Sequence, residues 1–395
     1  MRPNRPVYLD NQSTTPCDER VVSAMLPWFT ERFGNPHSSE HALGREASGA
    51  VEAARAEVAD LIGGEAREVI LVSGATEANN LAIKGAARFA AQQGDPRRRV
   101  ITVATEHPCV LEATRDLGRE DFEPVVLPVE PDGRLDPARL REALAVPTLL
   151  VSVMAANNET GVLQDIGALA AAAHEAGSLF HTDAAQAVGK IPLDVRDLGL
   201  DLLSLSGHKL YGPKGVGALW VRRRPRVRLA PLFSGGGQER GLRSGTLPTP
   251  LVVGLGEACR LARAEMAEEA RRVGALRERL LAGLRRGVAG LRVNGSMAHR
   301  LAGNLNLVFP GADAQALIAA VPDLCVSTGS ACSSAEVETS HVLRAIGVPD
   351  SDARCSLRLG LGRFTSAADV DFAVASLAAA YRAETSYAQD DLRRA

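Results

Sequence analysis

The sequence Ser204-Leu-Ser-Gly-His-Lys-Leu-Tyr-Gly-Pro-Lys-Gly215 closes an apolar segment that begins near Leu200. An apolar run that ends in glycine and proline predicts a buried strand followed by a tight turn. Lys209 lies at this strand end, beside hydroxyl and imidazole groups. Burial lowers the pKa of a lysine, and the neutral amine can then attack an aldehyde. We therefore expect Lys209 to present an amine to a bound aldehyde.

The chain contains only four lysines, at positions 84, 190, 209 and 214, although arginine is abundant. A Schiff base needs a lysine that can lose its proton, which arginine in practice cannot do. Lys84 lies on a predicted helix, Lys190 follows a glycine and Lys214 lies inside a Gly-Pro turn. We expect these three to be solvated surface lysines. Lys209 could, from these observations alone, also be a solvated surface lysine.

Bulk composition excludes several classes of protein. With 395 residues the chain can form one large core or two domains, and its formal charge of -2 argues against nucleic acid or an anionic membrane as the main partner. The amino-terminal sequence reaches polar residues before a signal-peptide core could form, and no apolar run approaches the length of a membrane span. The six cysteines show neither a C-x-x-C pair nor a zinc spacing. We expect a cytoplasmic protein with free thiols and no metal site.

Strands alternate with helical stretches from about residue 66 to residue 235, which predicts an α/β fold with a mostly parallel sheet covered by helices. We expect an opening helix over 19–33 and a long amphipathic helix over about 256–286 that bridges two domains. From Asn304 onward the pattern becomes mixed, which indicates a second, smaller α+β domain.

A phosphate site is indicated where the strand 68–72 runs into Ser73-Gly-Ala-Thr-Glu77. Small residues at a strand-to-helix junction leave backbone N–H groups directed outward at the positive end of the helix dipole, which favours an anion. The hydroxyl of Thr76 can add a further donor. Taken alone, the segment could also be an ordinary helix start capped by Ser73 or Thr76.

Polar side chains follow three further predicted strands, at the sheet edge where open α/β sheets collect ligands. His107 can stack on a flat aromatic cofactor, and Asn158 can contact a ligand. A buried Asp183 needs a cationic partner, for which a pyridinium nitrogen is suitable, and Gln186 can reach a ring hydroxyl. Each residue alone could be a loop histidine, a turn residue or a capping or ion-paired carboxylate.

Four segments remain. The basic run 222–228 suggests an edge strand with a solvated face rather than a nucleic-acid site, and 235–246 is a polar loop that could close over a phosphate. Cys332 lies among small and polar residues, so we expect an accessible, mobile loop with a thiol that can become a nucleophile. Arg358 on a strand can hold a carboxylate by a two-point contact. Cys332 could also be an unremarkable loop residue, and Arg358 could pair with a surface acid.

Together these groups describe pyridoxal phosphate chemistry on an amino acid, with a thiol nucleophile added. The chain resembles the cysteine desulfurases, class-V aminotransferase-fold enzymes of the nitrogen-fixation and housekeeping iron–sulfur type, from about residue 7 to residue 365. The motifs that carry the resemblance are Tyr8-Leu-Asp-Asn11, Ser73-Gly-Ala-Thr-Glu77, Asn157-Asn-Glu-Thr-Gly161, Asp183-Ala-Ala-Gln186, Ser206-Gly-His-Lys209, Arg243-Ser-Gly-Thr246 and Gly329-Ser-Ala-Cys332.

The resemblance implies a role for each matched residue. Lys209 would hold pyridoxal 5′-phosphate as a Schiff base and later move the Cα proton, and Cys332 would be the persulfide-carrying nucleophile. His107 would stack on the ring, and Arg358 would take the substrate carboxylate. The remaining contacts are implied to be Ala75, Thr76, Ser206 and His208 on the phosphate, Asp183 on the pyridinium, Gln186 and Asn158 on the ring-oxygen side, and Thr246 on the phosphate of the neighbouring subunit of a homodimer.

The resemblance also implies a fold, a reaction and partners. The fold would be fold type I of the pyridoxal-phosphate-dependent transferases, with a seven-stranded, mostly parallel sheet in a large domain over 16–260. Residues 1–15 and 261–395 would form the small domain that carries the cysteine loop. L-cysteine would give L-alanine and a Cys332 persulfide, which passes sulfur to an acceptor protein such as an iron–sulfur scaffold or a sulfurtransferase.

The chain departs from the family pattern in two places. The housekeeping members end in a Ser-Pro-Leu-Trp segment that helps dock the scaffold, whereas this chain ends Tyr387-Ala-Gln-Asp-Asp-Leu-Arg-Arg-Ala395, closer to the nitrogen-fixation branch. Glu336-Val-Glu-Thr339 stands where the family often has Leu-Glu-Pro. Alternative activities on this fold are selenocysteine lysis, transamination and another β-elimination. A sulfur-relay protein without turnover would be expected to have lost Lys209, Asp183 or Arg358.

Overall fold

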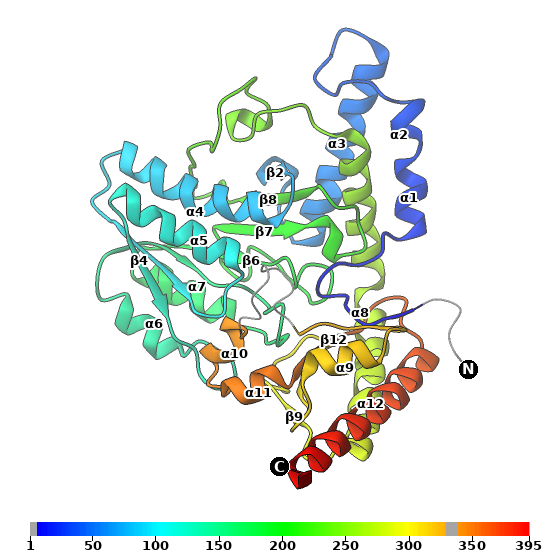
Figure 1. The fold of residues 1–395 in the computed structure, drawn as a ribbon. Coiled ribbons are helices and arrows are strands. Elements are labelled where there is room, and N and C mark those ends of the chain that lie inside the picture. The colour runs from blue at the N-terminus through cyan, green and yellow to red at the C-terminus, as the bar shows by residue number, and fades with distance from the viewer. Residues whose placement is uncertain (1–5, 329–338, 395) are drawn as a thin grey trace.

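A seven-stranded sheet forms the centre of the larger part of the molecule in the computed structural model, which describes residues 6–328 and 339–394 (Figure 1). Its strand order is β2-β8-β7-β6-β5-β3-β4. The strands are β2 (Val69–Val72), β3 (Arg99–Val103), β4 (Glu123–Leu127), β5 (Thr148–Ser152), β6 (Leu179–Asp183), β7 (Leu202–Ser206) and β8 (Gly217–Val221). Only β8 runs antiparallel to its neighbours, because the connection over residues 207–216 returns the chain from β7 to the adjacent position in the sheet. The expected mostly parallel seven-stranded sheet is confirmed.

Helices cover both faces of this sheet. One face packs against α4 (Ala75–Gln92) and α5 (Pro108–Asp116). The other packs against α1 (Glu19–Met25), α3 (Ala42–Leu61), α6 (Pro137–Ala143), α7 (Ile166–Glu175) and the first half of α8 (Thr249–Gly287). Because both faces are buried, strands of this sheet read as continuous apolar runs, such as Gly217-Ala-Leu-Trp-Val221 of β8. The polar residues His181 of β6 and Ser204 of β7 lie inside the sheet, fully buried, with His181 Nε2 2.9 Å from Ser204 Oγ.

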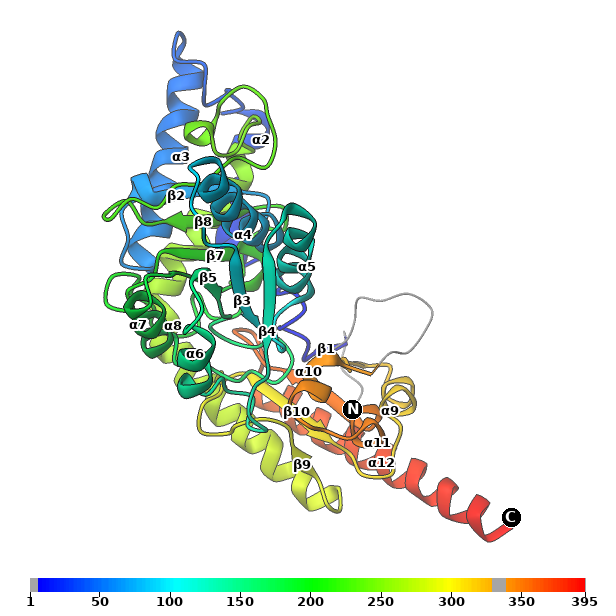
Figure 2. The same cartoon turned by 90° about the vertical axis from the view of Figure 1, so that its left-hand side faces the viewer.

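A second hydrophobic core lies at the other end of α8 (Figure 2). Its antiparallel sheet has the order β12-β10-β9, and β1 near the amino terminus pairs in parallel with β11. The elements are β1 (Val7–Tyr8), β9 (Arg292–Val293), β10 (Asn304–Val308), α9 (Ala314–Ala320), β11 (Leu324–Cys325), α10 (His341–Ala345), α11 (Asp350–Arg354), β12 (Ser356–Gly360) and α12 (Ala367–Arg394). The domain boundaries at residues 15 and 260 stay a prediction.

Three expected elements differ in the structure. The helix over 19–33 is two helices, α1 and α2 (Pro27–Thr30), because Pro27 has no N–H to continue the first one. The long bridging helix begins earlier than expected, at Thr249. The basic run after β8 is an irregular turn rather than an edge strand. Within the described residues, no helix is both long and apolar enough to cross a bilayer.

Candidate active site

Lys209 ends the short 3₁₀ helix Gly207–Lys209, which directly follows β7. Its Nζ donates to the backbone oxygens of Gln12 and Ser13, each at 2.6 Å. The positive charge of Lys209 contributes, after burial, to lowering the pKa of His208 to about 4. The predicted position of Lys209 at a strand end is therefore confirmed, and the amine is half-buried among other functional groups.

The start of α4 has the features of an anion site. Gly74 is the N-cap residue and no side chain caps the helix, so its first N–H groups are directed outward. The ends of β2 and β7 lie close together, since a Cβ atom added at Gly74 would lie 3.5 Å from Ser206 Oγ. His208 Nδ1 lies 3.0 Å from Thr14 Oγ1. Ala75 and Thr76 form the first turn of α4, as predicted, and Thr76 is exposed.

Asp183 provides a buried carboxylate at the end of β6, with 5% of its surface exposed. Its Oδ2 accepts from Asn79 Nδ2 at 2.7 Å and its Oδ1 accepts from the Ala185 N–H at 2.9 Å. Among the described residues it forms no ion pair, so only neutral donors face it. A buried carboxylate held in this way attracts a cation.

A second carboxyl group, that of Glu106, is fully buried near Asp183. Burial first, and then the charge of Asp183, raise its pKa well above the usual range. Its Oε1 accepts the Met154 N–H at 2.5 Å, while Oε2 is buried without a partner. The burial of Glu106 beside Asp183 therefore favours the protonated, neutral form of the Glu106 carboxyl group.

His107 caps α5 and lies beside this carboxylate. Burial lowers its pKa, Asp183 opposes that shift, and Lys209 and His341 add to it, which places these groups around one site. The Cys109 N–H donates to His107 Nδ1 at 3.2 Å. Nδ1 is therefore an acceptor, and the ring is neutral with its proton on Nε2. Cys109 Sγ, 3.0 Å from Nδ1, also contacts Asn79 Nδ2 and so links His107 to the residue that holds Asp183.

Arg358 lies on β12, as predicted, and its side chain is 3% exposed. Its Nη2 contacts Asp10 Oδ1 at 2.8 Å and Ser13 Oγ at 2.5 Å, and its Nη1 donates to the Asn158 backbone oxygen at 3.1 Å. Within the part of the chain that the structure describes, Asn158 Oδ1 and Arg358 Nε are buried and have no hydrogen-bond partner. Both are available to a ligand.

The segment 10–15 joins these groups, and reasoning from residue types alone did not assign it a role. It contacts Arg358 through two side chains, Lys209 through two backbone oxygens, and Gln186, whose Nε2 donates to the Gln12 oxygen at 2.9 Å. The only signal in the sequence was the resemblance of Tyr8-Leu-Asp-Asn11 to a family motif. Backbone carbonyl groups carry no sequence signature.

The loop 235–246 is more ordered than the expected polar loop. Glu239 is buried and accepts from Arg55 through both carboxylate oxygens, at 2.7 and 2.8 Å, and from the Leu71 N–H at 2.7 Å. Arg243 Nε donates to Glu77 at 3.0 Å. Thr246 follows these anchors and is exposed. The structure thus holds the loop against β2 and α4 but leaves Thr246 facing outward.

Cys332, the predicted nucleophile, lies outside the described residues. The chain after this gap is held by two contacts. Ser340 Oγ donates to Glu159 Oε2 at 2.5 Å, and His341 Nε2 lies 2.9 Å from the Glu106 backbone oxygen. The chain therefore leaves the undescribed stretch beside the loop that carries His107.

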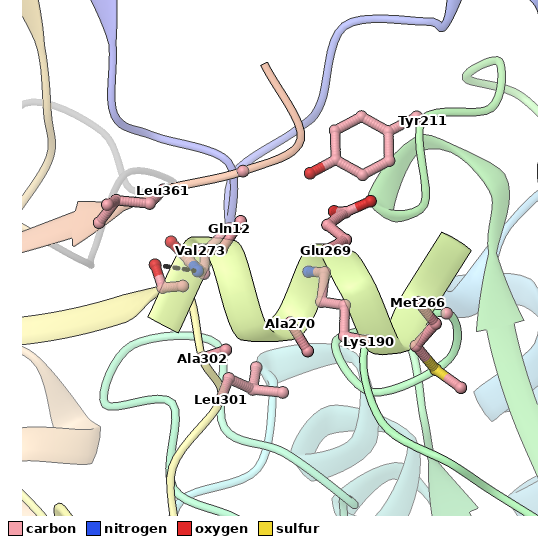
Figure 3. Close-up of a pocket in the computed structure, with 13 residues that line it drawn as sticks. Gln12, Lys190, Tyr211, Met266, Glu269, Ala270, Val273, Leu301, Ala302 and Leu361 are labelled. Carbon is pink, nitrogen blue, oxygen red and sulfur yellow. Dashed lines mark hydrogen bonds between the residues drawn. The ribbon is translucent and has the colours of Figure 1, made fainter. Parts of the chain in front are cut away.

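The prediction of solvated lysines is wrong at two positions. Lys84 forms an ion pair with Asp116 at 2.7 Å and its side chain is only 16% exposed. Lys190 lines a cavity of about 30 Å³ beside Glu269 of α8, with Gln12 also on its wall (Figure 3). Its Nζ donates to Gln186 Oε1 at 3.2 Å. Burial and then the charge of Lys209 lower the pKa of Lys190 to about 7. Lys214 is exposed, as predicted.

Replacing Lys190 with methionine is expected to stabilise the protein at neutral pH. In the unfolded chain this lysine binds its proton up to about pH 10.4, whereas in the fold it loses it near pH 7. The cost of burying the charge is therefore largest at pH 7 and below and fades as the pH rises toward 10. Thermal unfolding should show the melting temperature of Lys190→Met raised by about 1–3 °C at pH 7.

The same measurement at pH 9.5 should show a smaller difference between this variant and the wild type. Lys214→Met provides the matched control, since that lysine is exposed and should change the melting temperature little at either pH. A Lys190→Met protein that melts lower than the wild type at pH 7 would contradict the expectation. It would mean that the hydrogen bond to Gln186 outweighs the cost of burial.

Comparisons with known proteins extend over most of the chain. Residues 7–372 match the family model described as aminotransferase class-V. The protein named "Cysteine desulfurase IscS" from Anaeromyxobacter sp. (strain Fw109-5) is 55% identical over 369 residues, which cover 93% of this chain and 91% of that protein. A solved structure described as a NifS-like protein superimposes with a TM-score of 0.88 at 34% identity, covering 95% of this chain and 98% of that one. The structure "SspA in complex with cysteine" matches with a TM-score of 0.79 at 36% identity, covering 91% and 99%.

Proposed function

Because the chain belongs to the class-V aminotransferase family, and within it to the cysteine desulfurases, we propose that it removes sulfur from L-cysteine with Lys209, Asp183 and Cys332 as its reacting and cofactor-holding groups. Its cofactor is pyridoxal 5′-phosphate, as the family implies. The observation that carries the residue assignment is the Asp183 carboxylate, which is buried and faces only neutral donors.

The residues present fit the cofactor. The uncapped start of α4 suits a phosphate, and Asp183 suits a protonated ring nitrogen. Among the described residues, Asn158 Oδ1 is a buried polar atom without a partner, which suits a residue on the ring-oxygen side of the cofactor. The neutral His107 presents a flat ring next to these groups.

The chain's own residues then divide the work. When bound, pyridoxal phosphate withdraws electrons from the Cα atom of an amino acid. Lys209 would hold the cofactor covalently, and its amine would move the Cα proton. Arg358 orients the substrate carboxylate. The Cys332 thiolate attacks the substrate sulfur, the Cβ–S bond breaks, and the sulfur stays on Cys332 as a persulfide while L-alanine leaves.

The products of the purified enzyme test this assignment. With L-cysteine and a thiol reductant, sulfide and L-alanine should appear in equal amounts. Without the reductant, mass spectrometry should find one additional sulfur on the peptide that contains Cys332. Pyruvate and ammonia instead of L-alanine would indicate β-elimination. Sulfide release without persulfide on Cys332 would overturn its assignment as nucleophile.

We further propose a homodimer in which Thr246 completes the phosphate site of the neighbouring subunit. Thr246 is exposed on a loop that Glu239 and Arg55 hold in place. Leu26 and Phe29, at the start of and within α2, and Phe33, shortly after it, are each more than half exposed. Large exposed apolar side chains that lie close together in the sequence favour an interface between proteins.

Mixed dimers can test the exchange of Thr246. Lys209→Ala and Thr246→Ala subunits should each have little activity when pure. In a mixed dimer, the Lys209→Ala subunit would supply an intact Thr246 to the other subunit's Lys209 site, so activity should return at one site of two. No recovery in dimers confirmed by sedimentation would show that Thr246 acts within its own chain.

We place the enzyme in the cytoplasm and expect it to hand sulfur to an acceptor protein, either an iron–sulfur scaffold or a sulfurtransferase. A persulfide is a covalent carrier, so its sulfur has to be received by another thiol. Incubating the ³⁵S-loaded enzyme with a candidate acceptor, followed by non-reducing electrophoresis, would detect the transfer. Label that stays on the enzyme with every scaffold and sulfurtransferase tried would contradict this part of the proposal.

A further inference from the structure

Gln186, which is assigned to the ring-oxygen side of the cofactor, is held at both ends of its amide group. The residue is buried, with 4% of its surface exposed. Its Nε2 donates to the Gln12 backbone oxygen at 2.9 Å, and its Oε1 accepts from Lys190 Nζ at 3.2 Å. A backbone oxygen can only accept and an ammonium group can only donate, so the two contacts fix the orientation of the amide. Neither contact involves an atom of Lys209.

This orientation leaves an N–H group of Gln186 for the cofactor. Nε2 carries two N–H groups, and the Gln12 oxygen takes one of them. The second can donate to the ring oxygen of pyridoxal phosphate, whereas a flipped amide would present its carbonyl oxygen instead. A donor stabilises negative charge on that oxygen, and a carbonyl oxygen repels it. The orientation of the amide therefore decides whether Gln186 supports or opposes charge on the ring oxygen.

Lys190 lies where a lysine lowers the stability of the fold. Its side chain lines the cavity of about 30 Å³ beside Glu269 of α8, with the apolar residues Met266 and Val273 also on the wall (Figure 3). Burial lowers the pKa of its amine, so holding the charged form there costs free energy. Methionine at this position is expected to give the more stable protein. A residue that is kept at the expense of stability is typical of a functional site.

We propose that Lys190 is a positioning residue that holds the amide of Gln186 with its N–H group toward the ring oxygen of the cofactor. Lys190 acts through Gln186 rather than on the cofactor directly. The charged amine also draws electron density toward Oε1 of Gln186, which makes the N–H groups at the other end of the amide stronger donors. This inference rests on the proposed function, because it takes Gln186 as a contact of the ring oxygen.

The pH dependence of the cofactor absorbance in the holoenzyme, without substrate, reports this contact. The Schiff-base nitrogen of Lys209 shares its proton with the ring oxygen, and a second donor on that oxygen favours loss of the proton. Weakening the donor should therefore raise the pH at the midpoint of the absorbance change. We expect a rise of about 1 pH unit in Gln186→Leu, which removes the donor, and of about 0.5 unit in Lys190→Met, which removes its hold.

The double variant separates the effect on the amide from the effect of the charge. If Lys190 acts through Gln186, Lys190→Met should move the midpoint by less than about 0.2 unit once Gln186 is leucine. A shift of full size in that background would mean that the charge of Lys190 acts on the cofactor directly, and it would overturn the proposal. Lys214→Met is the matched control, since it removes an exposed lysine and should leave the midpoint unchanged. An equal shift in this control would also overturn the proposal.

The single variants distinguish failure of the inference from failure of the proposed function. An unchanged midpoint in Gln186→Leu would reject Gln186 as a contact of the ring oxygen, and with it that part of the proposed site. A shift in Gln186→Leu but none in Lys190→Met would leave the site standing and reject the role of Lys190. Thermal unfolding of each variant checks that the fold is retained, and Gln186→Ala takes the place of Gln186→Leu if leucine prevents folding.

Discussion

A Lys209→Ala enzyme is expected to turn over L-cysteine about 10⁴-fold more slowly than the wild type and to lose its covalently held cofactor. Lys209 is assigned two tasks, holding the cofactor and moving the Cα proton, and alanine performs neither. The nearby Lys190 is a neutral amine at pH values above about 7, yet its Nζ is engaged with Gln186 in a cavity beside α8. It is therefore not positioned to replace Lys209.

Borohydride reduction distinguishes the two amines directly. In the wild type, reduction should fix the cofactor to the peptide that contains Lys209, and in Lys209→Ala no lysine peptide should carry it. Added methylamine should restore part of the proton transfer, whereas Lys214→Ala should behave as the wild type because that lysine is exposed. Cofactor fixed to Lys190 in a variant that still turns over would contradict the assignment of Lys209.

Replacing Cys332 by alanine is expected to abolish the release of both sulfide and L-alanine from L-cysteine. A thiolate has to attack the substrate sulfur before the Cβ–S bond breaks, so both products depend on the same step. L-selenocysteine should still be consumed, because selenium leaves without thiol attack. The measurement is the amount of L-alanine formed from each substrate by the wild type and the variant.

The matched control is Cys355→Ala, which removes another free thiol and should leave both activities unchanged. Burial raises the pKa of Cys355, so this thiol is poorly suited to act as a nucleophile. If Cys332→Ala releases sulfide from L-cysteine as fast as the wild type, the persulfide mechanism is wrong and an elimination reaction explains the activity better.

The strand ends of the large sheet could be predicted because buried parallel strands have a distinctive apolar pattern. Lys209, Asp183 and His107 each lie at or just after the end of such a strand. The pattern alone therefore predicted that they lie at the same edge of the sheet. Arg358, far along the chain in the second core, was singled out from its strand position as a possible carboxylate site, and the resemblance to cysteine desulfurases added its assignment to the substrate.

Other features depend on contacts that no local pattern encodes. The partial burial of Lys190 comes from the cavity that it lines together with Glu269 of α8, and a lysine after a glycine gives no sign of it. The role of residues 10–15 rests on backbone oxygens and on an ion pair that spans 348 positions. Likewise, the 235–246 loop is anchored by Arg55, which lies far earlier in the sequence and donates to Glu239.

The pairing of β1 with β11 has a consequence for synthesis of the protein on the ribosome. Val7 and Tyr8 leave the exit tunnel long before their partners Leu324 and Cys325, which are translated more than three hundred codons later. At about 5–20 residues per second, β1 waits roughly 15–60 seconds for its partner strand. The large sheet can assemble in that interval, but the carbonyl groups that contact Lys209 and the guanidinium of Arg358 come together only after β12 has been translated. A nascent chain is thus unable to start amino-acid chemistry before Arg358 has emerged.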